Sequence, residues 1–319
     1  MKYRTLGRSG LRCSEIGLGT WAFASLVYGK VKEQEAQDAI RAAVDNGINF
    51  FDTAPLYGSK EEDGIAETIL GQGLKGIREK VLISSKFGRN PTENNAPNFH
   101  AQRVQESVES SLWRLKTDYL DVLFFHSPFS PEEIHDDVWE ALEKLKQAGK
   151  VKTVGHSISM FKDTEQMARE WAAERKIDVI QVVYSLMNRE SSALIQDLGR
   201  QNIGVVARES LANGFLSGKM TRDTVFEKGH INARYGKEEL EQRVDYLEKL
   251  DFLVRGEIDT LPKAAMRWVL DNPDVSLVLS GAKNKQEILE CGEASETTGY
   301  TSEELARANE IHLRDFQAA

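Results

Sequence analysis

The stretch DVLFFHSPFSPEEIHDDVWEALEKLKQAGKVKTVGHS, residues 121–157, contains one complete structural repeat of the chain. DVLFFH and VKTVGHS are apolar almost throughout, which is typical of strands that are buried on both faces. Between them, residues 131–148 begin after Ser130 with Pro131 and two glutamates and end before Gly149, which predicts a helix with the usual end signals. A strand, a helix and a second strand in this order predict two parallel strands joined by a right-handed crossover.

The same alternation recurs along the chain. Eight strand-like runs are IGLGT from residue 16, INFFDT from 48, VLISSK from 81, DVLFFH from 121, VKTVGHS from 151, DVIQVVY from 178, IGVVAR from 203 and VSLVLSG from 275. Helical patterns lie at residues 33–46, 101–116, 131–148, 164–174, 191–200, 262–272 and 285–291. Eight parallel strands alternating with helices predict an α/β protein with the (β/α)8 (TIM) barrel fold. Because no change in composition marks a linker, we expect residues 1–319 to form a single domain.

Four pieces do not fit the repeat, namely residues 1–14, 88–100, 220–259 and 301–316. Turn signals at Gly7 and Gly10 predict an N-terminal hairpin that closes the barrel floor. The second and third pieces are long loops after strands 3 and 7, the latter partly helical around residues 238–253, and the last piece is an extra C-terminal helix. Loops that follow strands lie on the catalytic face of such a barrel, so we expect them to cover a substrate, with ordinary surface decoration as the alternative.

The composition excludes several classes of partner. The 319 residues include 41 Lys and Arg against 50 Asp and Glu, a net charge of −9, which argues against a nucleic acid or an anionic membrane as partner. No run approaches the ~18 apolar residues of a membrane helix, and the polar N-terminus lacks a signal core. Two cysteines, Cys13 and Cys291, cannot build a disulfide framework or a zinc site, and no histidines have metal-ligand spacing. We therefore expect a cytoplasmic protein without a metal.

The run from Gly17 to Ala22, GLGTWA, matches the dinucleotide-binding pattern G-x-G-x-x-A. That pattern requires a helix that opens directly after the turn, and residues 21–30 lack the polar face of a surface helix. We therefore interpret the run as a barrel strand that ends in a tight loop.

Polar side chains stand where three neighbouring strands end. Asp52 ends the second strand, with Tyr57 five residues further on, and Lys86 and His126 end the third and fourth strands. In a barrel all four side chains reach the same face. A charged lysine after VLISS would be costly to desolvate without a partner, and Asp52 is the natural one. The alternative is a structural Asp–Lys pair with the tyrosine and histidine as bystanders.

This set of residue types suits the reduction of a carbonyl group by a hydride from a cofactor. A neighbouring ammonium favours the phenolate and should lower the pKa of Tyr57 from the usual value of ~10. Tyr57 would then act as a general acid near neutral pH, with His126 positioning the carbonyl oxygen.

Three motifs in fixed order carry a family likeness: GLGTW from residue 17, INFFDTAPLYG from 48 and SGAKNKQEILE from 280. With them the chain resembles the aldo-keto reductases, particularly the bacterial aryl-alcohol-dehydrogenase-like and potassium-channel β-subunit-like branches. The resemblance implies an NADPH-dependent oxidoreductase that acts on a small aldehyde, ketone or sugar. It also implies that Asp52, Tyr57, Lys86 and His126 form a catalytic tetrad.

The resemblance further implies which residues hold NADPH. At the nicotinamide end they are Thr20, Trp21, Asp52, Ser157, Gln181 and Arg208. At the pyrophosphate they are Leu216, Ser217, Gly218 and Lys219, and at the adenosine end Gly281, Lys283 and Glu287. The chain departs from the family pattern at Ile158, Arg208, Glu287 and Cys291. Lys283 and Lys285 favour the 2′-phosphate of NADPH, and Glu287 opposes it modestly.

Two other functions are compatible with the residues. One is a cofactor-binding, redox-sensing subunit with little turnover, and the other is a barrel lyase or isomerase with Lys86 as a Schiff-base amine. Aromatic residues that could line an apolar substrate pocket are Trp21, Phe23, Phe87, Phe99 and Phe129. The helical tryptophans expected in the core are Trp113, Trp139, Trp171 and Trp268.

Overall fold

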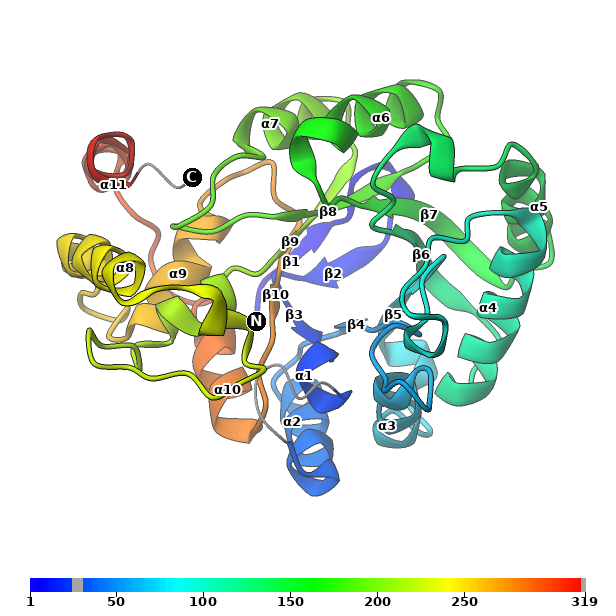
Figure 1. Ribbon diagram of the computed structural model, residues 1–319, viewed down its shortest axis with the longest axis horizontal. Coiled ribbons are helices and arrows are strands. Elements are labelled where there is room, and N and C mark those ends of the chain that lie inside the picture. Colours follow the sequence, from blue (N-terminus) through cyan, green and yellow to red (C-terminus); the bar gives the residue numbers. More distant parts are fainter. Residues whose placement is uncertain (25–30, 317–319) are drawn as a thin grey trace.

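The computed structural model describes residues 1–24 and 31–316 (Figure 1). Within them, parallel strands close into an eight-stranded barrel in the order β10-β3-β4-β5-β6-β7-β8-β9. These strands are β3 (Ile16–Gly19), β4 (Phe50–Asp52), β5 (Leu82–Phe87), β6 (Leu120–His126), β7 (Val151–Ser157), β8 (Val179–Val183), β9 (Gly204–Arg208) and β10 (Leu277–Ser280). The predicted (β/α)8 barrel is confirmed.

Helices connect successive strands and surround the barrel (Figure 1). They are α2 (Glu33–Asp45), α3 (Ile65–Gly73), α4 (Ala101–Leu115), α5 (Asp137–Gln147), α6 (Phe161–Ala173), α7 (Ser192–Arg200), α9 (Leu261–Leu270) and α10 (Lys285–Glu293). Each turns an apolar face to the strands: on α4, Val104, Val108 and Leu112 recur at intervals of four and are buried. Most of the core therefore lies between the ring of helices and the outer face of the barrel.

The barrel interior is a second, smaller core. It is filled by side chains such as Phe50, Phe124 and Val206, and Leu6 enters it from the N-terminal segment. Leu6 belongs to the loop between β1 (Tyr3–Thr5) and β2 (Arg12–Ser14), which form the predicted hairpin. The interior is packed with side chains, so the barrel itself is a core and not a binding cavity.

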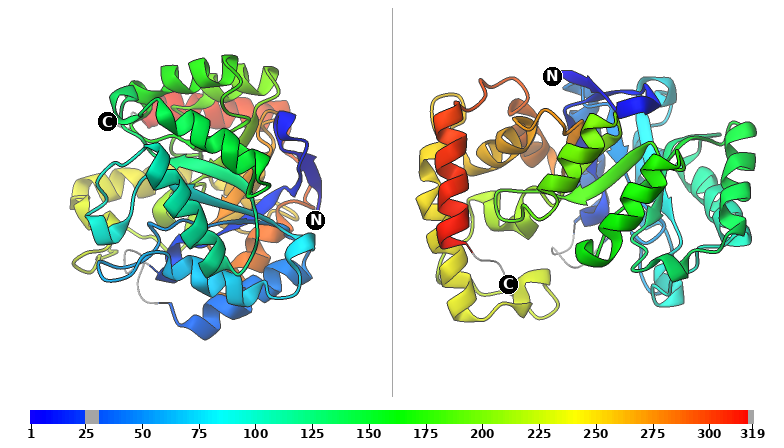
Figure 2. Two further views of the ribbon diagram at one scale, coloured as in Figure 1. Left: turned by 90° about the vertical axis from the view of Figure 1, so that its right-hand side faces the viewer. Right: turned by 90° about the horizontal axis from the view of Figure 1, so that it is seen from above.

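The long segment after β9 carries the 3-10 helix η6 (Ala212–Ser217) and helix α8 (Lys237–Lys249), and the chain closes with α11 (Ser302–Asp315). Helices α8 and α11 lie side by side outside the ring (Figure 2). Between them the Tyr246 hydroxyl lies 3.0 Å from Nδ1 of His312. The predicted insertion after strand 7 and the extra C-terminal helix are thus present. Within the described residues, no helix combines the length and apolar composition that crossing a membrane requires.

Three local expectations differ from the structure. Helix α3 was not predicted. The helix expected from residue 131 begins only at Asp137, because residues 131–133 form a single 3-10 turn and Ile134 is then extended in a bridge with Phe99. One helical turn, α1 (Trp21–Ala24), does follow GLGT. Residues 25–30, the rest of the segment we expected to be non-helical, lie outside the described residues.

Candidate active site

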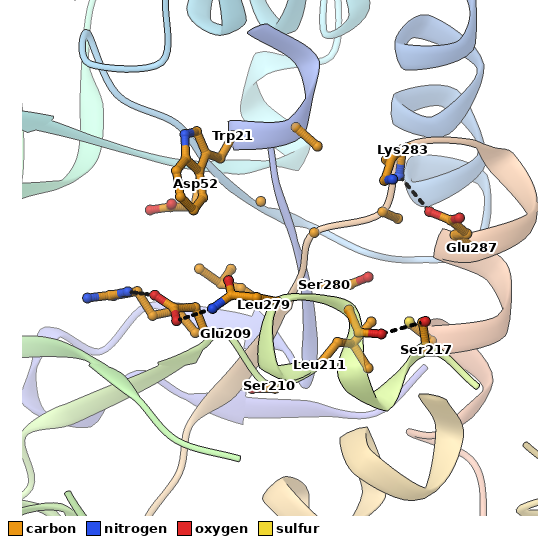
Figure 3. A pocket seen from close by; sticks show the side chains of 18 of the residues that line it. Trp21, Asp52, Glu209, Ser210, Leu211, Ser217, Leu279, Ser280, Lys283 and Glu287 are labelled. Carbon is orange, nitrogen blue, oxygen red and sulfur yellow. Dashed lines mark hydrogen bonds and ion pairs between the residues drawn. The ribbon is translucent and has the colours of Figure 1, made fainter. Parts of the chain in front are cut away.

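A cavity of about 450 Å³ opens at the carboxyl ends of the barrel strands. Trp21 and Asp52 lie at one end of it, and Lys283 and Glu287 lie at the other, beside α10 (Figure 3). We call these the barrel end and the α10 end of the cavity. The segment that follows β9 forms a further wall, to which Glu209 contributes (Figure 3).

The Asp52 carboxylate and the Lys86 ammonium form an ion pair at the barrel end. Oδ2 of Asp52 lies 2.7 Å from Nζ of Lys86, and both side chains are almost completely buried. Lys86 also donates to the carbonyl of Thr53 at 2.9 Å and to the hydroxyl of Tyr57 at 3.1 Å. These three acceptors match the three protons of the ammonium, which explains how a charged lysine is retained inside the barrel.

The other Asp52 oxygen is held from a different direction. Its Oδ1 accepts hydrogen bonds from the Ser84 hydroxyl at 2.7 Å and from Nε2 of Gln181 at 2.9 Å. Ser157 in turn donates to Oε1 of Gln181 at 2.9 Å. A hydrogen-bonded chain of buried groups therefore crosses the barrel from β7 through β8 to β4.

The electrostatic environment of Tyr57 differs from our expectation. Burial raises the pKa of Tyr57 above its usual value, although the Lys86 ammonium acts in the opposite direction. The expected lowering of the Tyr57 pKa is therefore wrong, because the loss of hydration outweighs the neighbouring charge. Asp52 and Tyr57 raise the pKa of Lys86 in spite of its burial. The phenol is consequently protonated at neutral pH beside a fixed cation.

His126, which also lines the barrel end of the cavity, is neutral. Burial and the positive charges of Lys86 and Arg208 hold the pKa of His126 well below its usual value. Its ring meets the Tyr57 ring edge-on, with 6.0 Å between the centroids. Nδ1 of His126 has no hydrogen-bond partner within the described residues.

The α10 end combines two lysines with one carboxylate. Oε1 of Glu287 accepts a hydrogen bond from Nζ of Lys219 at 3.0 Å, and Oε2 accepts one from the backbone N–H of Lys283, also at 3.0 Å. Lys285 is exposed and lines a separate surface hollow, so it does not contribute to this end of the cavity.

The structure brings most of the predicted site residues to the cavity wall. Those that line it are Trp21, Asp52, Tyr57, His126, Ser157, Gln181, Arg208, Ser217, Lys219, Gly281, Lys283 and Glu287. Lys86 lies behind Asp52 and Tyr57. Thr20 is fully buried and donates to the carbonyl of Asp52 at 3.0 Å, and Leu216 is part of the core. Gly218 lies in an exposed turn outside the wall.

Several lining residues were not predicted, including Ser127, Ser159, Glu209, Asn213 and His230. Glu209 forms an ion pair with Arg208, whose guanidinium also donates to the carbonyl of Ile158 at 3.0 Å. Both Ser127 and Glu209 directly follow a barrel strand. The strand-end reasoning that identified Lys86 and His126 would have found them too.

Most of the aromatic residues expected in the substrate pocket lie elsewhere. Phe23, Phe87 and Phe99 are buried in the core, and Phe129 is exposed. Trp21 lines the cavity, with its ring stacked near that of Tyr57. Trp113 was expected in the core but is 80% exposed, because the buried face of α4 passes through its neighbour Leu112.

A closed parallel barrel with a cavity at the carboxyl ends of its strands, into which several polar side chains project, is the architecture of many enzymes. Here the sequence profile of the Aldo/keto reductase family matches residues 15–312, and the chain belongs to that family. Family and fold together define an oxidoreductase that acts on carbonyl groups, in a family that generally binds a nicotinamide cofactor.

Individual relatives cover nearly the whole chain. Aldo-keto reductase YhdN of Bacillus subtilis is 33% identical over 311 residues, which are 94% of this chain and 90% of that protein. The NADH-specific methylglyoxal reductase of Escherichia coli is 31% identical, over 91% of this chain and 92% of its own length. The structure of the glycerol dehydrogenase AKR11B4 from Gluconobacter oxydans superimposes with a TM-score of 0.83 at 26% identity, covering 99% of this chain and 97% of that one.

Proposed function

We propose that the protein reduces an aldehyde or ketone with NADPH, and that Tyr57 donates a proton to the carbonyl oxygen. The observation that supports this most strongly is the hydrogen bond from Nζ of Lys86 to the Tyr57 hydroxyl, 3.1 Å long, at the wall of the cavity. Because the phenol oxygen accepts from Lys86, its own proton is available to a group in the cavity.

The donors along the cavity fit a nicotinamide dinucleotide. At the barrel end, the side chains of Ser157 and Gln181 offer the hydroxyl and amide groups that a carboxamide can bond. At the α10 end, Lys219 and the backbone N–H of Lys283 suit anionic phosphate oxygens. When bound there, the cofactor supplies the hydride. Lys219 and Lys283 are the side chains that support the preference for NADPH.

The residues at the barrel end divide the acid–base work. Tyr57 holds its proton at neutral pH and releases it toward the carbonyl oxygen as negative charge develops there. Lys86 then stabilises the phenolate, because its ammonium is already in contact and needs no rearrangement. Asp52 fixes Lys86, and neutral His126 offers a ring nitrogen that orients the carbonyl group.

The wall beside Tyr57 supports a small, partly polar substrate. Trp21 and Leu56 supply apolar surface, while Ser127 and Ser159 add hydroxyl groups. We infer that aldehydes, ketones and sugars of modest size enter here. A Schiff-base role for Lys86 is disfavoured, because its nitrogen is buried and makes three hydrogen bonds.

The test is a screen of aldehydes, ketones and sugars with NADPH and with NADH, followed by the nicotinamide absorbance. We expect turnover of at least one carbonyl compound, and we expect Tyr57→Phe to lower its rate by ~10²–10⁴-fold. Tight retention of the dinucleotide without turnover of any compound would contradict the proposal and favour a redox-sensing subunit instead.

A further inference from the structure

Arg89 is a buried cation in the loop that follows β5, and its side chain is fully engaged by hydrogen bonds. It lies two residues beyond the end of β5 and is only 6% exposed. Its Nε donates to two backbone carbonyls, that of His126 at 3.2 Å and that of Ser127 at 3.1 Å. Its Nη1 donates to the carbonyl of Asn95 at 2.8 Å, and its Nη2 pairs with the Glu133 carboxylate at 3.1 Å. Arg89 therefore joins the loop after β5 to the loop after β6.

Aromatic rings hold the guanidinium group of Arg89 in place. Its Cζ lies 4.1 Å from the centroid of the Phe129 ring and 5.9 Å from that of the Phe99 ring. Glu133 also accepts a hydrogen bond from the backbone N–H of Phe129 at 3.0 Å, so one carboxylate anchors both the cation and the residue that covers it. Hydrogen bonds and ring contacts together leave Arg89 little freedom to move.

The two carbonyls that Nε of Arg89 binds belong to the turn that follows β6. His126 is the last residue of this strand, and its side chain lines the cavity. Ser127 has a φ of 53°, in the left-handed region that residues with a side chain rarely adopt. The N–H of Ser127 donates to the carbonyl of Ser157 at 3.0 Å. Backbone bonding to β7 on one side and Arg89 on the other thus fix the turn in this unusual conformation.

We propose that Arg89 is a positioning residue for carbonyl reduction, which fixes the His126 ring at the cavity by binding the backbone carbonyls of His126 and Ser127. This inference rests on the proposed function, in which His126 orients the substrate carbonyl. Among the described residues, Arg89 is not one of those that line the cavity, so it acts through His126 and not on a ligand. The orientation of a reacting group affects the rate steeply, because a displacement of about 1 Å can cost ~10²-fold.

The charge of Arg89 and its geometry can be separated by the substitution Arg89→Lys. Burial and the positive charges of Lys86, Arg208 and Arg89 all lower the pKa of His126, while the neighbouring Tyr57 is uncharged. A lysine keeps the charge, so His126 should stay neutral. It lacks the planar fork with which the guanidinium reaches the two carbonyls, Asn95 and Glu133 at once. The variant therefore changes the position of His126 without changing its protonation.

NMR spectra of the protein with isotope-labelled histidine report the position of the His126 ring in the absence of any substrate. The signals of this ring are those that His126→Gln removes. We expect Arg89→Lys to shift or broaden them. Arg103→Lys is the matched control and should leave them unchanged, because Arg103 pairs with Glu93 of the same loop and makes no hydrogen bond to the turn after β6 within the described residues. Unchanged His126 signals in Arg89→Lys would overturn the inference.

A double-mutant cycle tests whether Arg89 affects the rate through His126. With the best carbonyl substrate, Arg89→Lys should lower kcat about tenfold and leave the dissociation constant of NADPH unchanged. In the His126→Gln background the same substitution should have no further effect on kcat, because the group that it positions is gone. A loss of activity that came only from weaker folding would be equally large in both backgrounds.

Glu133→Gln is a milder variant that keeps Arg89 and weakens its anchor. It should produce a smaller loss of kcat with the same dependence on His126, and it keeps the test decisive if Arg89→Lys does not fold. Equal losses of kcat in the two backgrounds would contradict the inference alone and leave the proposed function intact. If the wild type reduces no carbonyl compound, the proposed function and the inference are both contradicted.

Discussion

At the residue scale, the site depends on how the Asp52 carboxylate is held. One oxygen faces the Lys86 ammonium, and the other accepts from Ser84 and Gln181. Both oxygens of this buried carboxylate thus have hydrogen-bond donors, and the carboxylate in turn keeps Lys86 in place beside Tyr57. The acidity of the Tyr57 hydroxyl is the quantity that these contacts control.

The first prediction concerns Lys86→Met. Removing the ammonium takes away the group that opposes the effect of burial, so the pKa of Tyr57 should rise further. The rate of reduction should fall by roughly 10²-fold or more, because the phenol becomes a weaker acid and the phenolate loses its partner. The alkaline limb of the pH–rate profile should move to higher pH. A profile identical to that of the wild type, in a variant whose thermal unfolding shows it to be folded, would separate Lys86 from the acidity of Tyr57.

Ser84→Ala tests the far side of the same carboxylate, with Ser85→Ala as its matched control. Ser84 donates to Asp52, whereas the adjacent Ser85 faces outward and donates to Glu67 at 2.6 Å. Each substitution should cost about 1–2 kcal/mol in the free energy of unfolding, because each leaves a buried carboxylate oxygen with one donor fewer. Only Ser84→Ala should move the alkaline limb of the pH–rate profile to higher pH. Without the Ser84 hydrogen bond the negative charge of Asp52 is less dispersed, and this charge disfavours the Tyr57 phenolate. Equal pH–rate profiles in the two variants would show that Ser84 has a structural role alone.

At the scale of elements, β7 contributes to both faces of the barrel wall. Ser157 lies at its end beside the cavity, while His156 points outward and packs against Trp171 of α6, with 4.9 Å between ring centroids. Both ring nitrogens of His156 are buried and have no partner within the described residues. The layer between strands and helices therefore holds a histidine that must stay neutral.

His156 makes the stability of this layer depend on pH. Burial lowers the pKa of His156 from 6.5 to about 3, so the unfolded chain binds a proton between these values and the folded chain does not. The free energy of unfolding should consequently fall as the pH drops from 6.5 toward 3. In His156→Phe this loss is absent, and the wild type should lose about 2 kcal/mol relative to the variant between pH 7 and pH 5. Urea titrations at the two pH values measure the difference, and parallel changes in both proteins would refute it.

Some helices and strands could be predicted from the sequence and others could not. The barrel strands could be predicted because burial on both faces leaves short, continuous apolar runs such as VLISSK. Helix α3 was missed because it contains Gly71 and Gly73, which lower helix propensity. The structure explains Gly71: a Cβ there would lie 2.6 Å from the carbonyl oxygen of Arg114 at the end of α4. Close packing between α3 and α4 therefore requires a glycine at position 71. This requirement arises from a contact between segments distant in the sequence, so no local sequence pattern predicts it.

The same contrast applies to the site. Asp52, Lys86 and His126 could be placed together from the sequence, because strand ends of a barrel share one face. The direction of the change in the Tyr57 pKa could not be predicted from the sequence, because it depends on how completely the folded structure removes water from the hydroxyl group. The bond between Lys219 and Glu287 was also invisible, since it joins residues 68 positions apart through loop geometry.

At the scale of the whole molecule, barrel closure brings distant segments around one cavity. Its wall includes Trp21 near the N-terminus, Gln181 of β8 and Glu287 of α10. The proposed ligand would therefore touch segments from both halves of the sequence and stabilise them together. The hairpin and Leu6 close the opposite end of the barrel.

Ligand binding should accordingly stabilise the whole fold. At a free NADPH concentration of 100 times the dissociation constant, the free energy of unfolding should rise by about 2.7 kcal/mol. Differential scanning fluorimetry should show a single transition at a higher temperature for the wild type and for Tyr57→Phe alike. An unfolding temperature that does not respond to NADPH or NADH would contradict the proposed cofactor site.

The most direct measurement is a single-turnover reduction by the preformed NADPH complex of Tyr57→Phe, using the best carbonyl substrate of the wild type. The phenylalanine ring keeps the wall of the cavity but removes the only proposed proton donor. We predict that the rate of NADPH oxidation falls by ~10²–10⁴-fold, while the dissociation constant of NADPH, measured separately, stays unchanged. A wild-type rate in this variant would show that the proton comes from elsewhere and would contradict the proposed mechanism.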